Sequence, residues 1–466
     1  MSKLQRGLLV LAIGIVLWFC PVPTGLKLEA WHLFAIFVAV IAGFILQPMP
    51  IGAIAFIGIT FTALSGILKP EEVLSGFSGD TIWLIVAAFL FAKAFTKSGL
   101  GRRIAYLLIK RIGDSTLKIG YTLALTEFII SPATPSNTAR GAGIVYPIAR
   151  SLASAFNSEP GASANRVGAY LMQVGYQSNI ITSGMFMTSM AANPLISLLA
   201  AQALHIQLTW GMWAAAAIVP GFLSLLIIPY FLYKVYPPEV THTPEAKALA
   251  EDALQSMGEM TFAEKVVAVV FVGALILWGT AQYTNLNATI VAMLAVSVML
   301  MANVLEWKDV LEEKGAWDTF IWMGSLISLA DYLSKLGFIP WLAQVVGTSL
   351  QGISWIPVFL ILVAIYMYAQ YGFASMTAHV VSMYSALVSV AAAAGAPPFL
   401  AALSLAYVSS LCGSLTHYAA GPAPIYFGAG YIEQGKWWQQ GFFVSIINLI
   451  IWIGIGSMWW KVLGLW

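Results

Sequence analysis

Two short polar stretches stand inside long apolar segments of this chain. Residues 135–141 read Pro-Ser-Asn-Thr-Ala-Arg-Gly, and residues 374–379 read Ala-Ser-Met-Thr-Ala-His. The second stretch follows the first at a distance of 239 residues, counted from Thr138 to Thr377. Polar and cationic side chains are costly in hydrocarbon and usually mark a site when they occur there. We therefore expect the two stretches to form the two halves of one anion-binding site.

Each stretch has the features of a turn at which one helix ends and another begins. Prolines at 132 and 135 remove backbone donors and interrupt any helix through the first stretch. A helix start exposes free amides and partial positive charge, which suit a carboxylate. A diacid could then place one carboxylate at each turn. The expected substrate-binding residues lie at the two turns and at two later breaks: Ser136, Asn137, Thr138, Ser375, Met376, Thr377, Asn193, Pro194, Gly421 and Pro422.

Arg140 and His379 occupy the same place in the two stretches, two residues after the threonine. Arginine stays charged at physiological pH, whereas histidine can be charged or neutral. The sequence shows no acidic residue near Arg140 in its hairpin, so its expected partner is the substrate anion. The alternative is that Arg140 reaches the membrane interface or binds helix-end carbonyls. His417, beside the second break, is a further site candidate.

The composition is that of a polytopic helical membrane protein. Of the 466 residues, 60% are hydrophobic and 9% are charged, against about 25% charged in soluble proteins. The net charge of +2 and the absence of a basic run predict no nucleic-acid partner. Cys20 and Cys412 are too few to form a disulfide framework. No catalytic acid–base pair, metal-ligand motif or cofactor motif is found, so we expect neither an enzyme nor a cofactor.

Apolar segments of about 17 to 25 residues are candidates for spans. They predict an all-α protein with about 11 transmembrane helices and two re-entrant hairpins, at about 120–155 and 354–395. The basic link at 97–118 indicates a cytoplasmic N-terminus and an outside C-terminus. Residues 100–112 within it resemble an amphipathic interfacial helix. The link at 234–265 reads as a solvated cytoplasmic connector.

The two halves of the chain repeat one plan. Asp80 is echoed by Asp318 and Lys97 by Lys335, and both echoes fit a shift of 238 residues. Each unit holds five spans and one hairpin, so the second unit enters the membrane upside down, as in secondary transporters with broken helices. We expect a first helix in residues 1–29, repeats in 30–233 and 266–466, and a linker in 234–265. Asp331 is expected to pair with Lys335, one helical turn later.

These motifs resemble the divalent anion/sodium symporter family over nearly the whole chain. The closer likeness is to its exchanger branch, which includes bacterial citrate/succinate and tartrate/succinate antiporters and the chloroplast 2-oxoglutarate/malate translocator. The strings at 136–140, 373–379 and 415–418 carry this likeness. The resemblance implies a homodimer with an elevator mechanism. It also implies scaffold helices in 30–118 and 266–353, and transport-domain helices in 119–233 and 354–466.

In sodium-coupled members of that family, small neutral residues stand where Arg140 and His379 stand here. The resemblance therefore implies that these two residues are fixed cations replacing sodium. An empty carrier would then move unneutralised positive charge through the membrane, a costly step. The expected function is sodium-independent exchange of C4 and C5 dicarboxylates across the cytoplasmic (inner) membrane. The alternatives are a sodium-coupled di- or tricarboxylate symporter of the same fold and, from another class, an intramembrane enzyme or a channel.

Overall fold

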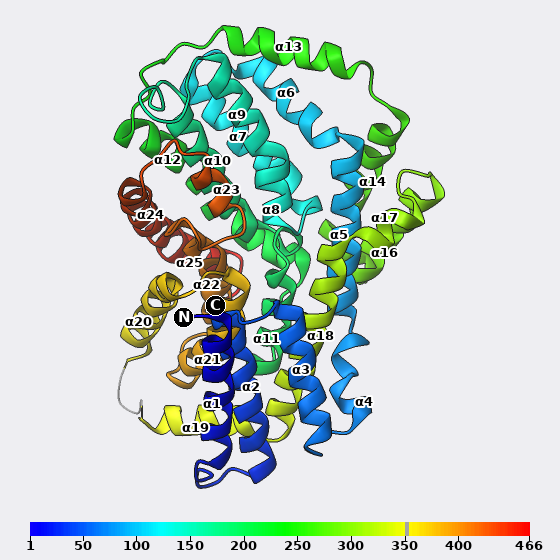
Figure 1. Ribbon diagram of the computed structural model, residues 1–466, viewed down its shortest axis with the longest axis vertical. Coiled ribbons are helices and arrows are strands. Elements are labelled where there is room, and N and C mark those ends of the chain that lie inside the picture. The colour runs from blue at the N-terminus through cyan, green and yellow to red at the C-terminus, as the bar shows by residue number, and fades with distance from the viewer. Residues whose placement is uncertain (350–353) are drawn as a thin grey trace.

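The computed structural model describes residues 1–349 and 354–466 and consists of helices joined by turns (Figure 1). In this part of the chain, seven helical segments are long and apolar enough to cross a membrane: α2 (Leu28–Leu46), α5 (Asp80–Ser98), α12 (Trp210–Val235), α14 (Phe262–Gly279), α20 (Trp355–Ala369) with its following turn, α21 (Met376–Ala393), and α24 (Gln434–Leu449) continued by α25 (Gly456–Val462). Four shorter apolar segments are α3 (Ile51–Leu64), α11 (Ala192–Leu204), α16 (Ala288–Met301) and α22 (Pro398–Leu411) with its turn. The all-helical membrane class is confirmed, and the count of about 11 spans stays a prediction.

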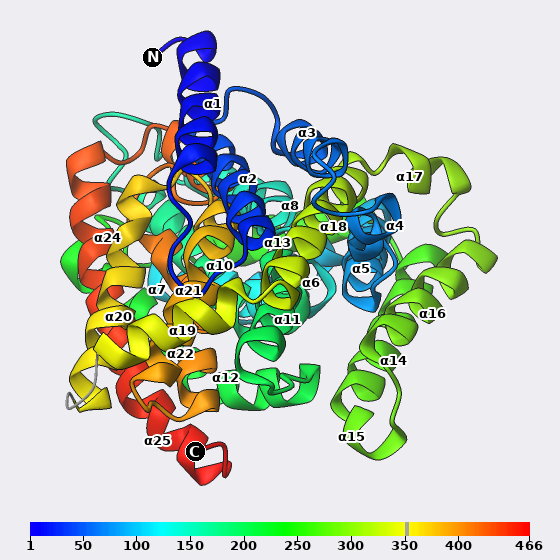
Figure 2. The same ribbon diagram turned by 90° about the horizontal axis from the view of Figure 1, so that it is seen from below.

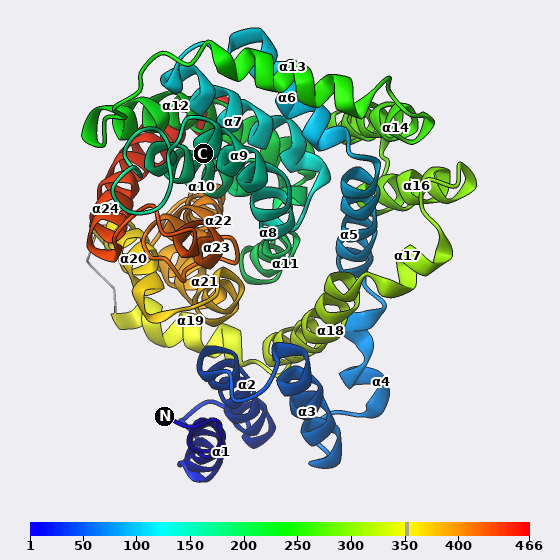
Figure 3. The same ribbon diagram turned by 45° about the horizontal axis from the view of Figure 1, so that its top comes forward.

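One group of helices is built crosswise from the two halves of the chain. From the first half, α3 packs against α18 (Lys314–Lys335) of the second, and α16 of the second half packs against α5 of the first. In Figure 3, α3, α18, α5 and α16 follow one another along one side of the molecule. Figures 1 and 2 both place α14 and α16 on the side opposite to α20 and α24. By contrast, α1 (Lys3–Phe19) packs mainly on α2 and buries none of its own residues.

The second group of helices surrounds α10 (Gly168–Met185). Every residue of α10 is buried, because α7 (Thr116–Ile130), α9 (Tyr146–Ala155), α12 and α22 all pack on it. In α22, nearly all residues are buried as well. These two helices therefore form the centre of the group, and both lead directly into the site.

Both predicted broken spans are broken where the sequence indicated. The first changes from α10 through a 3-10 turn (Met187–Ser189) into α11, and the second changes from α22 through a 3-10 turn (Cys412–Ser414) towards α23 (Ala423–Gly428). Both predicted hairpins are also helix–turn–helix units. The first joins α7 to α8 (Asn137–Arg140), which continues through a π-helical turn (Gly141–Val145) into α9, and the second joins α20 to α21.

At one end of the molecule, two helices that lie side by side connect the two groups. The predicted amphipathic segment is α6 (Leu100–Ile112), with the expected bounds. The linker at 234–265, expected as a solvated connector, contains the helix α13 (Glu245–Met257), which packs along α6 (Figure 1). The buried side chains of Arg103 and Glu264 form an ion pair of 2.6 Å there, and Arg103 also donates to the carbonyl of Gly258 at the end of α13. In the second half of the chain, α19 (Phe338–Ser349) follows α18 as α6 follows α5 in the first half.

Candidate functional site

The two polar stretches of the sequence meet at one cavity. Its volume is about 260 Å³, slightly below the range of about 300–1,000 Å³ that is usual for drug-sized ligands, so it suits a small molecule. None of the side chains that line it carries a formal charge. The lining residues are Phe89, Pro135, Ser136, Asn137, Thr138, Met190, Ala191, Ala374, Ser375, Met376, Thr377 and Gly421.

Each hairpin presents the start of a helix to this cavity, and a serine caps that start in both cases. Ser136 Oγ accepts from the amide of Ala139 at 3.1 Å, and Ser375 Oγ accepts from the amide of Ala378 at 3.3 Å. A serine at this position is a strong helix start signal because it satisfies one of the free amides. The remaining free amides and the partial positive charge of the two helix starts are the natural partners of an anion.

Asn137 supplies a donor that has no partner of its own. Its side chain lines the cavity and is 9% exposed, and its Nδ2 atom has no hydrogen-bond partner among the described residues. Leaving a buried amide donor unpaired costs about 1–3 kcal/mol. A ligand carboxylate in the cavity would remove that cost, so Asn137 is suited to an anionic ligand.

The turn of each hairpin is tied to the break of the same repeat. Thr188, in the first break, donates through its hydroxyl to the carbonyl of Pro132 at 2.7 Å. Gln370, in the second turn, donates through Nε2 to the carbonyl of Ala419 at 3.1 Å. These bonds satisfy carbonyls that the interrupted helices leave free, which membrane-depth backbone requires. Each turn and its break therefore form one unit of the cavity wall.

Gly421 brings the second break directly against the first turn. A Cβ atom added at Gly421 would collide with the hydroxyl of Thr138. Gly421 and Thr138 belong to different repeats, so their close contact joins the two repeats at the wall of the cavity. Glycine is needed here for space, since its backbone must come close to a neighbour.

Arg140 is fully buried and does not line the cavity, and the expectation that it lacks an acidic neighbour is wrong. Its Nε donates to Oε2 of Glu127 at 2.6 Å, and both side chains are 0% exposed. Its Nη1 donates to the carbonyls of Thr134 at 2.8 Å and Ser189 at 3.0 Å. These two bonds agree with the alternative interpretation, in which Arg140 binds helix-end carbonyls. The guanidinium joins the first turn to the first break from behind.

Glu127 is the main residue that the sequence reasoning missed. It lies on α7, and Asn179 of α10 donates through Nδ2 to both of its carboxylate oxygens at 3.1 and 3.2 Å. A hairpin turn near Thr134 stands midway between residues 127 and 140, so the folding of the hairpin itself brings them together. That symmetry about the turn is the signal that could have identified Glu127.

The second repeat holds a corresponding cluster without a carboxylate or a guanidinium. Tyr366 stands 13 residues before His379, as Glu127 stands before Arg140, and the two rings stack with centroids 4.2 Å apart. The Tyr366 hydroxyl bonds Ser409 at 2.9 Å, and His379 Nδ1 lies 3.8 Å from Cys412 Sγ. His379 is buried and does not line the cavity, and its Nε2 has no hydrogen-bond partner in the described part of the chain.

Four other predicted residues also lie outside the cavity lining. Asn193 is buried, and its amide donates to the carbonyls of Ser183 at 2.8 Å and Phe186 at 2.9 Å, so it supports the first break from inside. Pro194 and Pro422 are buried at the starts of α11 and α23. His417 accepts through Nδ1 from Trp438 Nε1 at 3.0 Å and packs among aromatic rings.

Comparisons with known proteins extend over the full length of the chain. A family model described as the sodium:sulfate symporter transmembrane region matches residues 1–466. The chain is 50% identical over 465 residues to YflS of Bacillus subtilis strain 168, whose name assigns it provisionally to malate transport, and the match covers 100% of this chain and 97% of that one. It is 44% identical over 458 residues to the chloroplast dicarboxylate transporter 1 of Spinacia oleracea, covering 97% and 80% of the two chains.

Two further comparisons concern a bacterial relative and a solved structure. The chain is 39% identical over 470 residues to the inner membrane protein YbhI of Escherichia coli K12, covering 99% of this chain and 98% of that one. The crystal structure of the YdaH transporter of Alcanivorax borkumensis matches with a TM-score of 0.61 at 13% identity, covering 99% and 98% of the two chains. This last likeness concerns the fold alone.

Proposed function

The chain belongs to the family of the sodium:sulfate symporter transmembrane region. Because of this membership and of the cavity between its two hairpins, we propose that it exchanges C4 and C5 dicarboxylates across the cytoplasmic membrane. The substrates are acids of the succinate, malate, fumarate and 2-oxoglutarate type. Membership of a transporter family excludes the enzyme alternative. Relatives named as transporters of malate or dicarboxylates support the substrate class. The observation that carries the proposal is the pair of capped helix starts facing one cavity lined by uncharged side chains, with the unpaired amide of Asn137 at the first helix start.

Sodium independence is supported by the position of the Arg140 guanidinium. Carbonyl and hydroxyl oxygens are the ligands that a hard cation takes in proteins. Arg140 already occupies such oxygens, on Thr134, Ser189 and Ser183, at 2.8 to 3.0 Å. A permanent cation then holds the first turn to the first break, and no ion has to enter with the substrate. In the second repeat the stacked pair of Tyr366 and His379 fills the corresponding place.

The charge of the carrier differs from the sequence expectation. With Glu127 ionised, its pair with Arg140 carries no net charge, so an uncompensated arginine is not what opposes movement of the empty carrier. The obstacle that we propose is the unfilled cavity. The unpaired donor Asn137 Nδ2 would have to cross the membrane without a partner, at a cost of about 1–3 kcal/mol. A bound dicarboxylate removes that cost, which favours exchange over net transport.

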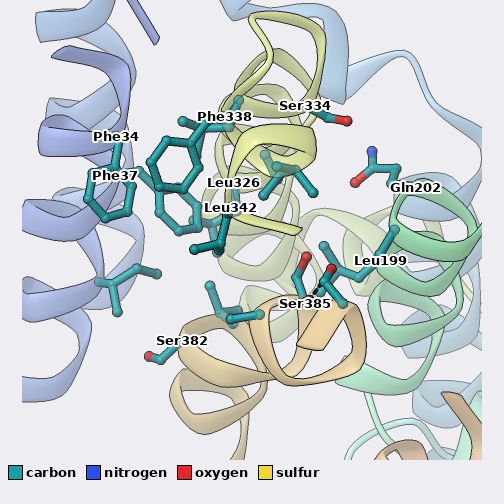
Figure 4. A pocket seen from close by; sticks show the side chains of 18 of the residues that line it. Phe34, Phe37, Leu199, Gln202, Leu326, Ser334, Phe338, Leu342, Ser382 and Ser385 are labelled. Carbon is teal, nitrogen blue, oxygen red and sulfur yellow. Dashed lines mark hydrogen bonds between the residues drawn. The ribbon is translucent and has the colours of Figure 1, made fainter. Parts of the chain in front are cut away.

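An elevator mechanism is supported by a cavity between the two groups of helices. A cavity of about 400 Å³ lies between α2, α18 and α19 on one side and α11 and α21 on the other. Figure 4 shows Phe34 and Phe37 of α2 on one side of it, with Leu199 of α11 across from them. In the first repeat, α6 also lies close to the first hairpin, because a Cβ on Gly101 would lie 3.0 Å from Ile144.

We therefore propose that the second group of helices slides along the first and that this cavity closes in the other conformation. The first group, residues 30–118 and 266–353, is the scaffold, and the second, 119–233 and 354–466, is the transport domain. The boundary at 353 falls on residues outside the described ones. The N-terminus lies in the cytoplasm and the C-terminus outside, and two copies assemble through their scaffolds into a homodimer.

Counterflow in proteoliposomes tests the exchange. Purified protein is reconstituted into vesicles loaded with unlabelled succinate or malate, and uptake of labelled succinate is measured with sodium or with choline as the external cation. We expect uptake that requires internal dicarboxylate and is equal in the two salts. Uptake into empty vesicles driven by an inward sodium gradient would instead establish the sodium-coupled alternative. Flux without counterflow in either salt would indicate a channel.

A further inference from the structure

One cavity wall comes from outside the hairpins and the broken helices. Phe89 lies on α5, a helix of the first group that packs against α16 and α18. All the other lining residues belong to the two turns or the two breaks. Phe89 is therefore the lining residue that the scaffold supplies.

The ring of Phe89 lies close to Gly315 of α18. A Cβ added at Gly315, at the start of α18, would lie 3.1 and 3.4 Å from two atoms of that ring. The absence of a side chain at Gly315 thus leaves room for the ring of Phe89. The start of α18 therefore limits movement of the ring towards that helix when a larger ligand enters the cavity.

The chemistry of this wall differs from that of the turns. Hydroxyl and amide groups of Ser136, Asn137 and Thr138, together with their counterparts in the second turn, can bind carboxylates. Phe89 offers neither a donor nor a charge. A carboxylate forced against the ring would lose its water without gaining a hydrogen bond, and burying a charge without a partner is strongly unfavourable.

We propose that Phe89 is a specificity-determining residue that excludes a third carboxylate, so that the cavity accepts dicarboxylates and rejects tricarboxylates. The inference rests on the proposed function, because it assumes that the two turns hold the two carboxylates of the substrate. A hydroxyl substituent on a dicarboxylate can turn towards the polar turns. A third carboxylate on a central carbon faces the ring.

Competition in the counterflow assay tests this role. Wild-type protein, Phe89→Ala, Phe89→Leu and the control Phe56→Ala are reconstituted with internal succinate, and uptake of labelled succinate is inhibited by external succinate or citrate. Phe56 is a suitable control because it is an exposed phenylalanine on α3, away from the cavity. We expect Phe89→Ala to reduce the ratio of the citrate to the succinate inhibition constant at least tenfold, Phe89→Leu to reduce it less, and Phe56→Ala to leave it unchanged.

An unchanged ratio in Phe89→Ala, with succinate exchange still running, would overturn the assignment while leaving the proposed function intact. Absence of succinate counterflow in the wild-type protein would instead reject the proposed function. If Phe89→Ala is inactive, the same ratio is obtained from the concentrations of succinate and citrate that raise the Tm of the purified variants. A Tm response to succinate alone in both Phe89 variants would then also overturn the assignment.

Discussion

The carboxylate of Glu127 and the guanidinium of Arg140 form an ion pair 2.6 Å long in which neither side chain is exposed. This pair makes Arg140 a structural cation that holds the first turn in place, beside the cavity and not within it. Its counterpart, the stack of Tyr366 on His379, is built from residues at equivalent positions. The two repeats thus support their turns in the same place with different chemistry.

The first prediction concerns the buried pair. Arg140→Ala leaves the Glu127 carboxylate buried without its cation, and removal of one partner from such a pair costs about 3–5 kcal/mol. We expect this variant to lose both exchange and thermal stability, and not exchange alone. Glu127→Gln should do the same, because the guanidinium then lacks its charge partner. The Tm of the purified variants and their counterflow rates check both statements.

The control for this pair is taken from the other repeat. The double variant Glu127→Tyr with Arg140→His introduces the residue pair that the second repeat uses at the same positions. It leaves neither a buried carboxylate nor a buried guanidinium without its partner, so its Tm should exceed that of either Arg140→Ala or Glu127→Gln. A double variant less stable than both would show that the cluster depends on the charge pair itself.

A second prediction concerns the close approach at the cavity. Gly421→Ala places a methyl group against the hydroxyl of Thr138, so exchange should fall at least tenfold. The double variant Gly421→Ala with Thr138→Ala lacks the obstructing hydroxyl, so it should be as stable as the wild-type protein. Its exchange should stay low, because that hydroxyl also lines the cavity. Gly428→Ala is the control, because a Cβ there meets no atom within 4 Å. Wild-type exchange by Gly421→Ala would mean that this contact is not fixed during transport.

A third prediction tests the sliding movement. Ala386 lines the 400 Å³ cavity between the two groups of helices, and Ala386→Phe fills part of it. If this space closes in the other conformation, the variant should still bind succinate, seen as a rise in Tm, but exchange it much more slowly. Ala393→Phe makes the same change at the exposed end of the same helix and should exchange normally. Equal rates in the two variants would contradict a closing cavity.

The fourth prediction concerns the connection between α6 and α13. The side chain of Arg103 is buried against Glu264, whereas that of its neighbour Arg102 is exposed. Arg103→Ala should therefore lower stability by about 3–5 kcal/mol, and Arg102→Ala by less than about 0.5 kcal/mol. Comparison of thermal unfolding of the two variants decides this. Equal losses would show that the buried pair contributes no more than an exposed arginine.

Features that repeat along the chain could be predicted from the sequence. The register that relates Thr138 to Thr377 placed both turns in one cavity, because an inverted repeat brings equivalent loops together. Local patterns were also sufficient for the bounds of α6 and for the pair of Asp331 with Lys335, which is 2.6 Å long in the structure.

Contacts between elements far apart in the sequence could not be predicted in this way. Phe89 reaches the cavity from α5, and no repeat or motif marks it. Asn193 was expected at the cavity because it follows a break. Its amide instead donates to the carbonyls of Ser183 and Phe186, which the break leaves without helical partners. The helix α13 was missed although Ala246 and Ala250, one helical turn apart, are both buried against its neighbours.

The crosswise packing of α3 on α18 and of α5 on α16 bears on how this protein is made. A ribosome adds about 5–20 residues per second, so α3 waits on the order of 10–50 seconds before α18 emerges to cover it. During that interval its apolar surface must be shielded by lipid, by the insertion machinery or by a chaperone. The packing of α3 and α5 is therefore completed only after the second half of the chain has been made.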